Sequence, residues 1–327
     1  MHRLTWGMVA KPAESGHNLG NNEAARRNWR EHIQRTERFS IASVAGEEVA
    51  AVLTKVTGAI VRGVLVMVLV AMPSVLLPGT GADGRQMAAL VALFVGVLTF
   101  IEYNAHTPAL VEFRDAAPYN RIRYCMLLAM VVVLVPVVGQ SHSTLGALMR
   151  AVAYVCGLAL DFPYSPVRLV TILLAHDAPP ELVRTVRSAA GTAYFIAMFS
   201  LIFFVSVLRL QGWPARNGAF NVWVNLPTFD PTAGGDVVAR LERDARVNVA
   251  LGFLLPFVIP AVVKAGGMGM GALDLGSPQT LTWTIAAWAF LPASLCMRGI
   301  AMARIAGMIR ERRRRHMDDD APGYVAA

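Results

Sequence analysis

The sequence is poor in charge. Asp, Glu, Lys and Arg make up 16% of the 327 residues, whereas 55% of the residues are hydrophobic. A soluble domain usually carries about 25% charged residues, so much of this chain's surface is expected to face something other than water. The apolar residues also come in long unbroken runs, which the short amphipathic elements of a soluble core would not show. The composition therefore predicts an integral membrane protein.

Cysteine and catalytic signatures are scarce as well. Cys125, Cys156 and Cys296 stand singly in apolar surroundings, which argues against a disulfide framework or a thiolate metal site. The sequence has no Walker, GxSxG or HExxH motif, and the GxGxG pattern within residues 266–271 follows no predicted strand. We therefore expect no bound metal and no cofactor. A non-catalytic protein is favoured, and a membrane enzyme is kept as an alternative.

What the sequence does contain is a set of six hydrophobic runs that can cross a bilayer core of about 30 Å as helices. They are Thr57 to Leu77, Met87 to Tyr103, Tyr124 to Gly139, Ala189 to Leu208, Val249 to Val263 and Leu281 to Ile300. We predict an all-α fold, a polytopic transmembrane helical bundle of about six spans with short interfacial helices.

A seventh run, Leu145 to Leu160, is harder to interpret because it is short and carries Arg150. Both ends of the chain are rich in arginine, so the positive-inside rule places both termini in the cytoplasm and requires an even number of spans. Six spans put the arginine-rich loops 105–123 and 209–248 on the inside. Residues 145–176 are then interfacial or re-entrant, and seven or eight spans are the alternatives.

The domain organisation follows from these spans. Residues 1–45 are expected to form a cytoplasmic basic arm with an amphipathic helix from Glu23 to about Arg38 and a turn near Ser40. Residues 46–309 form the transmembrane helical domain, and residues 310–327 form a tail that is basic and then acidic. Stop-transfer charge accounts for the arginines of this tail, so no nucleic-acid partner is expected.

The basic residues also suggest a source. Of the 30 basic residues, only Lys11, Lys55 and Lys264 are lysine, a usage that we attribute to a GC-rich bacterial genome. We therefore expect a multi-pass protein of the bacterial inner (cytoplasmic) membrane.

The centres of the spans lack charge, which argues against a proton or ion relay inside the bilayer. The densest polar cluster lies instead at the inner interface, after the second span. Glu102 and His106 are four residues apart, so they share a helix face if the helix continues. They could bind a metal or shuttle a proton, and the plainer interpretation is a polar cap that ends a helix. The candidate cluster consists of Glu102, His106, Glu112, Arg114, Asp115 and Arg121.

A second candidate is the long inner loop 211–248, which is rich in aromatic and turn residues. Asp236 is predicted to cap an amphipathic helix from Val237 to Asn248. The loop either lies along the membrane interface or docks a partner subunit, since ordered loops of this length are often functional. The candidate docking residues are Trp213, Trp223, Asn225, Asp230, Arg240 and Arg243.

Two prolines of the fifth span, Pro256 and Pro260, are a candidate hinge because each removes a helical hydrogen bond on the same face. Three functions fit the whole pattern. The favoured one is a non-catalytic membrane protein that organises, assembles or docks with a larger membrane complex. Its partners would be the lipid bilayer and either other membrane subunits or further copies of itself. The alternatives are a small-solute transporter or channel with proline-kinked helices and, behind it, an enzyme acting on lipid through Glu102, His106, Glu112 and Asp115.

Overall fold

The computed structural model describes residues 23–174, 176–214, 225–230, 232, 234–266 and 276–319; for residues 23–47, 316, 318 and 319 it describes the backbone alone. Within these residues the fold is all helical, with no strand. The chain divides into two compact units, residues 1–56 and 57–327. The helices are α1 (Glu23–Leu76), α2 (Ala82–Asn104), α3 (Tyr119–Val138), α4 (Thr144–Leu160), α5 (Pro166–Thr171), α6 (Pro180–Leu210), α8 (Val237–Ala265) and α9 (Pro278–Asp319).

Six segments of these helices are long and apolar enough to cross a membrane, as the hydrophobic runs predicted. They are Glu48–Leu76, Ala82–Asn104, Tyr119–Val138, Pro180–Leu210, Val237–Ala265 and Pro278–Arg315. The prediction of a polytopic helical bundle with six spans is confirmed. The chain is an integral membrane protein whose apolar helices fit a lipid bilayer.

The first unit contains the beginning of α1. The predicted helix does begin at Glu23, but the turn expected near Ser40 is wrong, since the helix continues without a break to the boundary of the unit. The stretch after Ser40 holds no proline and is rich in alanine, a strong helix former. Nothing in it therefore ends the helix.

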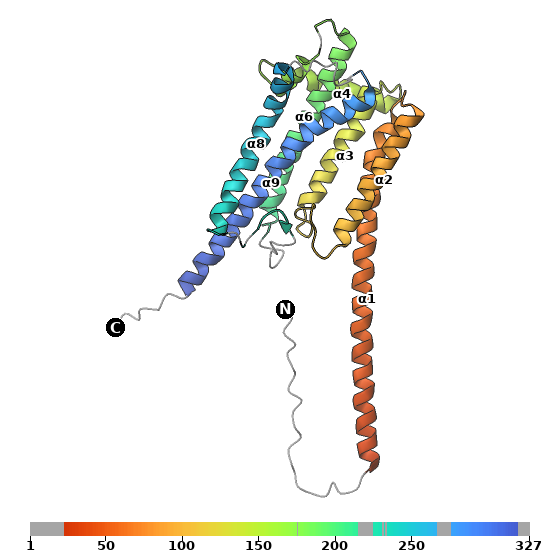
Figure 1. Ribbon diagram of the computed structural model, residues 1–327, viewed down its shortest axis with the longest axis vertical. Coiled ribbons are helices and arrows are strands. Elements are labelled where there is room, and N and C mark those ends of the chain that lie inside the picture. Colours follow the sequence, from red (N-terminus) through yellow and green to blue (C-terminus); the bar gives the residue numbers. More distant parts are fainter. Residues whose placement is uncertain are drawn as a thin grey trace, which may run out of the picture. The chain divides into compact units, whose positions relative to one another are not determined.

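The second unit is a bundle in which successive long helices run in opposite directions (Figure 1). We call one of its ends the loop end. The C-terminal ends of α2 and α6, the N-terminal ends of α3 and α8, and residues 105–118 lie there. The opposite end holds α4 and α5. Because successive long helices run in opposite directions, the described parts of the two predicted inner loops, 105–123 and 209–248, lie at the same end of the bundle.

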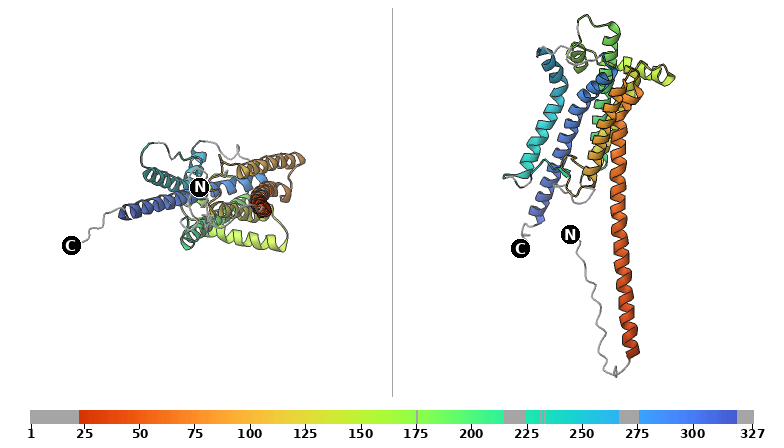
Figure 2. Two further views of the ribbon diagram at one scale, coloured as in Figure 1. Left: turned by 90° about the horizontal axis from the view of Figure 1, so that it is seen from below. Right: turned by 45° about the vertical axis from the view of Figure 1, so that its right-hand side comes forward.

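The short helix α4 contains the seventh apolar run, Leu145 to Leu160. It is 17 residues long, begins at a cap in which the Ser143 hydroxyl accepts the N–H of Gly146 at 3.1 Å, and ends at Asp161. It lies across the ends of the long helices instead of beside them (Figure 2). The Asp161 carboxylate is nearly buried between Arg168 at 3.3 Å and Arg187 at 3.5 Å. Charged side chains in the hydrocarbon core of a bilayer are costly, so this group of one acid and two arginines is consistent with a short helix at the edge of the membrane.

Small residues set where the helices of the second unit touch. A methyl group on Gly63 of α1 would lie 2.8 Å from the carbonyl oxygen of Gly96 on α2, so the two helices cross in backbone contact there. Gly252 of α8 and Gly299 of α9 have equally little space toward each other's helix, with atoms of the partner helix at 2.5 and 2.6 Å from such a methyl group. Close backbone approach of this kind is the usual way in which membrane helices associate.

The glycine contacts lead to a first prediction. Gly299→Ala should push α9 away from α8, because the new methyl would meet the Ala245 carbonyl oxygen at 2.6 Å. We expect it to lower the free energy of unfolding by about 1–3 kcal/mol, measured as a lower melting temperature of the purified protein in detergent. Gly307→Ala is the matched control on the same helix, where no atom lies within 4 Å. The control should be neutral or stabilising by up to about 1 kcal/mol, and equal losses in both variants would contradict this packing.

The N-terminus of α8 is capped as the sequence predicted. The Asp236 carboxylate accepts the N–H groups of Val238 at 3.4 Å and Ala239 at 3.3 Å, and Arg313 of α9 donates to it at 2.6 Å. Asp236 lies before the membrane-spanning segment. The hydrogen bond from Arg313 holds the pKa of Asp236 below its usual value of 3.8, and the two N–H groups act in the same direction.

This cap predicts acid sensitivity. A carboxyl whose folded-state pKa is depressed stabilises the fold above its unfolded pKa of 3.8, and that contribution is lost as the pH falls through the lower folded value. Asn at this position caps equally well but cannot form the ion pair. We therefore expect Asp236→Asn to melt below the wild type at pH 6 and the difference to shrink below about pH 4. Asp83→Asn, at an exposed acid of α2, is the control; a pH-independent difference for Asp236→Asn would contradict the prediction.

Candidate functional site

The loop after α2 is shaped by a buried acid, Glu102, which was predicted as part of a polar cluster. Only 7% of this residue is exposed. Its carboxylate accepts three consecutive backbone N–H groups, from Ala109 at 3.0 Å, Leu110 at 2.9 Å and Val111 at 3.2 Å. Three charge-assisted hydrogen bonds to one carboxylate fix a loop firmly. Glu102 therefore serves here to fold the chain back on itself.

Arg114 completes the same loop from its other end. Its guanidinium lies mostly out of solvent and donates to the carbonyl oxygens of Glu102 at 3.1 Å and Ala105 at 2.7 Å. It also pairs at 3.2 Å with the exposed carboxylate of Asp115. His106, by contrast, is exposed, and within the described residues its side chain forms no hydrogen bond or ion pair with Glu102. The structure does not bring the predicted Glu102 and His106 together as a proton-transfer pair.

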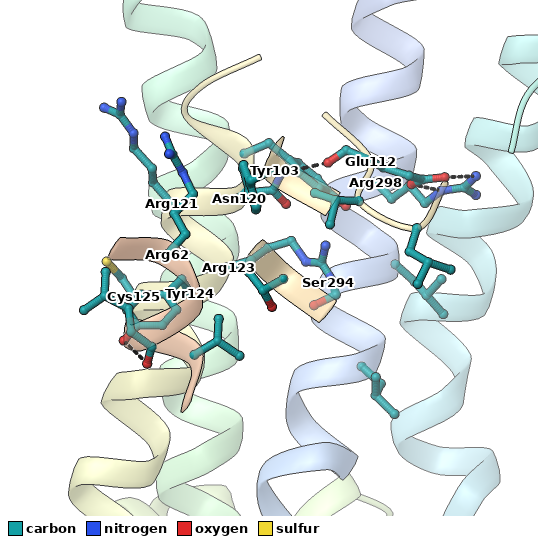
Figure 3. A pocket seen from close by; sticks show the side chains of 18 of the residues that line it. Arg62, Tyr103, Glu112, Asn120, Arg121, Arg123, Tyr124, Cys125, Ser294 and Arg298 are labelled. Atoms are coloured by element: carbon teal, nitrogen blue, oxygen red, sulfur yellow. Dashed lines mark hydrogen bonds and ion pairs between the residues drawn. The ribbon is translucent and has the colours of Figure 1, made fainter. Parts of the chain in front are cut away.

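The strongest polar contact of the loop end joins Glu112 to Arg298 of α9. The Arg298 guanidinium donates a hydrogen bond to each oxygen of the Glu112 carboxylate, at 2.6 and 2.8 Å (Figure 3). The Thr228 hydroxyl donates to Glu112 at 2.7 Å, and the Asn248 side-chain oxygen accepts from Arg298 at 3.0 Å. The side chains of Glu112 and Arg298 are only 13% and 24% exposed. One ion pair thus ties the loop after α2 to the segment before α8 and to both α8 and α9.

Asn225, a predicted docking residue, connects the two inner loops. Its side-chain oxygen accepts the N–H of Asp115 at 3.1 Å, and its carbonyl oxygen accepts the N–H of Phe113 at 2.7 Å. Phe113 has a φ of 52°, which is uncommon for a residue with a side chain. Its ring is fully buried against Tyr119, with ring centroids 4.3 Å apart, and near Trp213 at 6.2 Å. The cluster and the docking loop, predicted as separate features, form one structure.

The remaining docking residues divide between buried and exposed positions. Trp213 is buried in the core. Arg240 lies over the Phe229 ring at 4.8 Å and donates to the carbonyl oxygen of Asp230 at 2.8 Å, so both face their own loop. Arg243 is exposed beside Asp244. Trp223 lies outside the described residues. Trp213 and Asn225 are thus buried and hold the loop together, whereas Asp230 and Arg243 are exposed.

The candidate hinge lies in a helix that stays continuous. Proline has no N–H, so Pro260 leaves the carbonyl oxygen of Pro256 without its usual donor in α8. The indole N–H of Trp288 on α9 donates to that oxygen at 3.2 Å. The gap in the α8 hydrogen-bond ladder is therefore closed by a neighbouring helix.

A cavity of about 1350 Å³ adjoins this network and is lined by residues of α1, α2, α3, α8 and α9 and of the loop after α2. Two predicted residues, Glu112 and Arg121, line it, as do Leu255 and Ile259 beside the two prolines. The other lining side chains include Val61, Arg62, Leu65, Val66, Thr99, Tyr103, Leu110, Val111, Tyr119, Asn120, Arg123, Tyr124, Cys125, Leu291, Ser294, Leu295 and Arg298. The cavity therefore has polar residues of this network in one part of its wall and apolar side chains in the rest.

The charge in this cavity is uneven. Four arginines, Arg62, Arg121, Arg123 and Arg298, face a single acid, Glu112, which is already paired with Arg298. Arg121 and Arg123 lie in the first turns of α3, at the loop end (Figure 3).

Arg62 belongs to the same end of the cavity. Its guanidinium stacks over the ring of Tyr103, near the end of α2, at 4.7 Å. Deeper lining residues are apolar: Leu291 precedes Arg298 by about 10 Å along α9. The cavity is therefore cationic toward the loop end and apolar beyond it.

Sequence reasoning missed most of these arginines as a group. Arg62 and Arg298 each stand near the end of a hydrophobic run and look like isolated charges that reach for the membrane surface. The spacing Arg121-x-Arg123 at the start of a span was the available signal. Within the described residues there is no group of three or more His, Cys, Asp or Glu side chains that could hold a metal ion.

Comparison with protein-family models, with curated proteins and with known structures found no match to this chain. The site is therefore interpreted from its own geometry and charge.

The Glu112–Arg298 pair gives a prediction for stability. Glu112→Gln should leave the half-buried Arg298 guanidinium without its counter-charge, and breaking such a pair from one side is strongly destabilising. We expect a loss of about 2 kcal/mol or more in the free energy of unfolding, seen as a lower melting temperature. Glu181→Gln, which breaks the exposed pair with Arg184 on α6, is the control and should leave the melting temperature unchanged. A wild-type melting temperature for Glu112→Gln would show that the pair contributes nothing.

Proposed function

We propose that this membrane protein binds an amphiphile with an anionic headgroup in the cavity between α1, α2, α3, α8 and α9. The observation that carries the proposal is the division of the cavity into a cationic end and an apolar remainder. An anionic headgroup fits beside the arginines, and a hydrocarbon chain fits against Leu65, Leu255 and Leu291. A molecule with both parts matches the whole cavity better than a purely polar or purely apolar ligand.

The energetics favour such a ligand. Each buried CH₂ group of a chain contributes about 0.8 kcal/mol, and each basic residue near an anionic headgroup contributes about 1 kcal/mol. The three arginines that Glu112 does not pair, Arg62, Arg121 and Arg123, leave an excess of positive charge at one end of the cavity. An anion in the cavity would balance that excess.

The position of the cavity indicates where the ligand comes from. The arginine-rich loop end corresponds to the cytoplasmic side by the positive-inside rule, so we propose that both termini are cytoplasmic. In a bacterial inner membrane, the ligand would then come from the inner leaflet. The test of this topology is the labelling of single cysteines introduced at Asp230 and Asp83 in intact cells; labelling of the Asp230 position from outside would contradict it.

The other functions predicted from the sequence receive different support. Of the four acid–base groups predicted for an enzyme acting on lipid, Glu102 accepts three backbone N–H groups and Glu112 is held by Arg298. Asp115 pairs with Arg114, and neither Asp115 nor the exposed His106 lines the cavity. A transporter of small polar solutes would not need the apolar wall formed by leucine, isoleucine and valine residues. These contacts make both alternatives weaker proposals than the binding of an amphiphile.

An organising or docking role is a second proposal with its own observation. In the most apolar window of α2 only 17% of the residues are buried, compared with 67% in the span of α9. A helix so poorly covered by its own chain can take a lateral partner, either another membrane subunit or a second copy. Purification in a mild detergent followed by native mass spectrometry tests this role. A monomer without a stoichiometric protein partner would contradict it.

The cavity gives a direct prediction. Leu255→Trp should fill the apolar part of the cavity and displace the chain of the ligand. Leu254→Trp is the matched control, because the neighbouring side chain is exposed on the outer face of α8 and does not line the cavity. We expect wild type and Leu254→Trp to retain about one tightly bound anionic lipid per chain after purification and Leu255→Trp to lose it. Lipid extraction and mass spectrometry give the amounts.

Two outcomes would contradict the proposal. Equal retention of anionic lipid by Leu255→Trp and Leu254→Trp would show that the lipid binds elsewhere. A preference for neutral over anionic lipid in the wild type would show that the arginines do not select the ligand.

A further inference from the structure

Ser294 of α9 presents an unused hydroxyl to the cavity. The residue is only 6% exposed, and its Oγ is buried without a hydrogen-bond partner in the described part of the chain. A serine or threonine inside a helix normally returns its hydroxyl to the carbonyl oxygen four residues earlier. Ser206 does so to Ile202 at 2.9 Å, and Thr282 to Pro278 at 2.8 Å. The Ser294 hydroxyl, in the wall of the cavity, does not form this hydrogen bond.

Arg123 of α3 presents a second unused donor to the same cavity. Its guanidinium lies over the rings of Tyr119 at 5.2 Å and Phe290 at 5.6 Å. These rings stabilise the positive charge through their faces, and the guanidinium also donates a hydrogen bond to the Tyr119 side chain. Its Nε–H, however, is buried and has no hydrogen-bond partner among the described residues. Phe290 and Ser294 are one helical turn apart on α9, so the guanidinium of Arg123 reaches the part of α9 that carries Ser294 (Figure 3).

The neighbouring Arg298 and Arg62, in contrast, have no buried side-chain nitrogen without a hydrogen-bond partner among the described residues. Arg298 donates to Glu112, Asn248 and Thr228. Arg62 donates to the carbonyl oxygen of Gly58 at 2.8 Å and stacks on Tyr103. A buried donor left without an acceptor is costly, and native proteins rarely keep one without a reason. Two such donors on facing helices of one cavity indicate that an acceptor from outside the chain belongs between them.

We propose that Arg123 and Ser294 form the subsite for a phosphate group, and that the ligand of the cavity is a phosphate-headed lipid. This inference rests on the proposed binding of an anionic amphiphile and specifies its headgroup. The donors come from α3 and α9, two different walls, and Arg62 of α1 adds charge from a third. A tetrahedral phosphate offers oxygens toward several walls at once, whereas the two oxygens of a carboxylate lie in one plane and suit a single guanidinium.

The experiment compares headgroups of different chemistry on the full-length protein in detergent micelles. The probes are phosphatidic acid, a fatty acid with the same chain, diacylglycerol and inorganic phosphate, each titrated by native mass spectrometry. We expect phosphatidic acid to bind most tightly in the wild type. Ser294→Ala should weaken it by about tenfold or more, because a hydrogen bond to a charged group is lost. Fatty-acid binding should change by less than about twofold.

Three further variants separate the hydroxyl and the guanidinium from general effects. Ser294→Thr keeps a hydroxyl and should retain phosphatidic acid, which guards against a misfolded Ser294→Ala. Ser206→Ala, at a serine already bonded to its own helix, should bind as the wild type does. Arg123→Lys keeps the charge but loses the Nε–H, and should weaken phosphatidic acid by about tenfold.

The outcomes that overturn the subsite differ from those that overturn the binding of an amphiphile. Equal binding of phosphatidic acid and fatty acid in the wild type, or wild-type binding of phosphatidic acid by Ser294→Ala, would overturn the phosphate subsite alone. Inorganic phosphate binding as tightly as phosphatidic acid would overturn the lipid as its source. If Leu255→Trp retains phosphatidic acid as the wild type does, the ligand does not occupy the cavity, and the proposed function itself fails.

Discussion

The ion pair between Glu112 and Arg298 is the contact on which the loop end depends. An arginine within an apolar helix is expensive in a bilayer unless a counter-charge and further acceptors surround it. The carboxylate of Glu112 and the side-chain oxygen of Asn248 supply that surrounding for Arg298. Since Glu112 also carries the bond from Thr228, the loop after α2 and the segment before α8 are both anchored on α9. The same pair neutralises the acid of the cavity and leaves the other arginines uncompensated.

Charge at the loop end of this protein serves two separate purposes. Part of it builds the loop, as the carboxylate of Glu102 and the guanidinium of Arg114 do through bonds to the backbone. The rest lines a cavity that continues into an apolar interior. This division fits the proposed binding of an amphiphile, which needs polar side chains only where its headgroup would lie.

The fold was largely predictable from local sequence features, whereas the site was not. Long apolar runs locate the spans because a helix is the only backbone conformation that hydrocarbon tolerates, and the cap at Asp236 is visible in the residues that follow it. The Glu112–Arg298 and Asp115–Asn225 contacts join positions 186 and 110 residues apart, and no local pattern encodes such pairings.

The cavity itself was missed for a related reason. The environments of Arg62 and Arg123 depend on which helices pack beside them, which periodicity does not reveal. The turn predicted near Ser40 was wrong for a different reason. A single serine was interpreted as a turn signal, although the residues around it favour a continuous helix.

The bond from Trp288 to the carbonyl oxygen of Pro256 has a mechanical consequence. Bending α8 at its prolines would break this hydrogen bond and disturb the close contacts at Gly252 and Gly299. We therefore expect α8 and α9 to move together as one rigid pair. Any widening of the cavity then falls to α2, whose most apolar window has the smallest buried share of the six spans, 17%, and to the part of α1 that contacts it at Gly63. Their Gly63–Gly96 crossing keeps these two helices together as a pair, so that a sideways swing of the pair would open the cavity directly to the surrounding lipid.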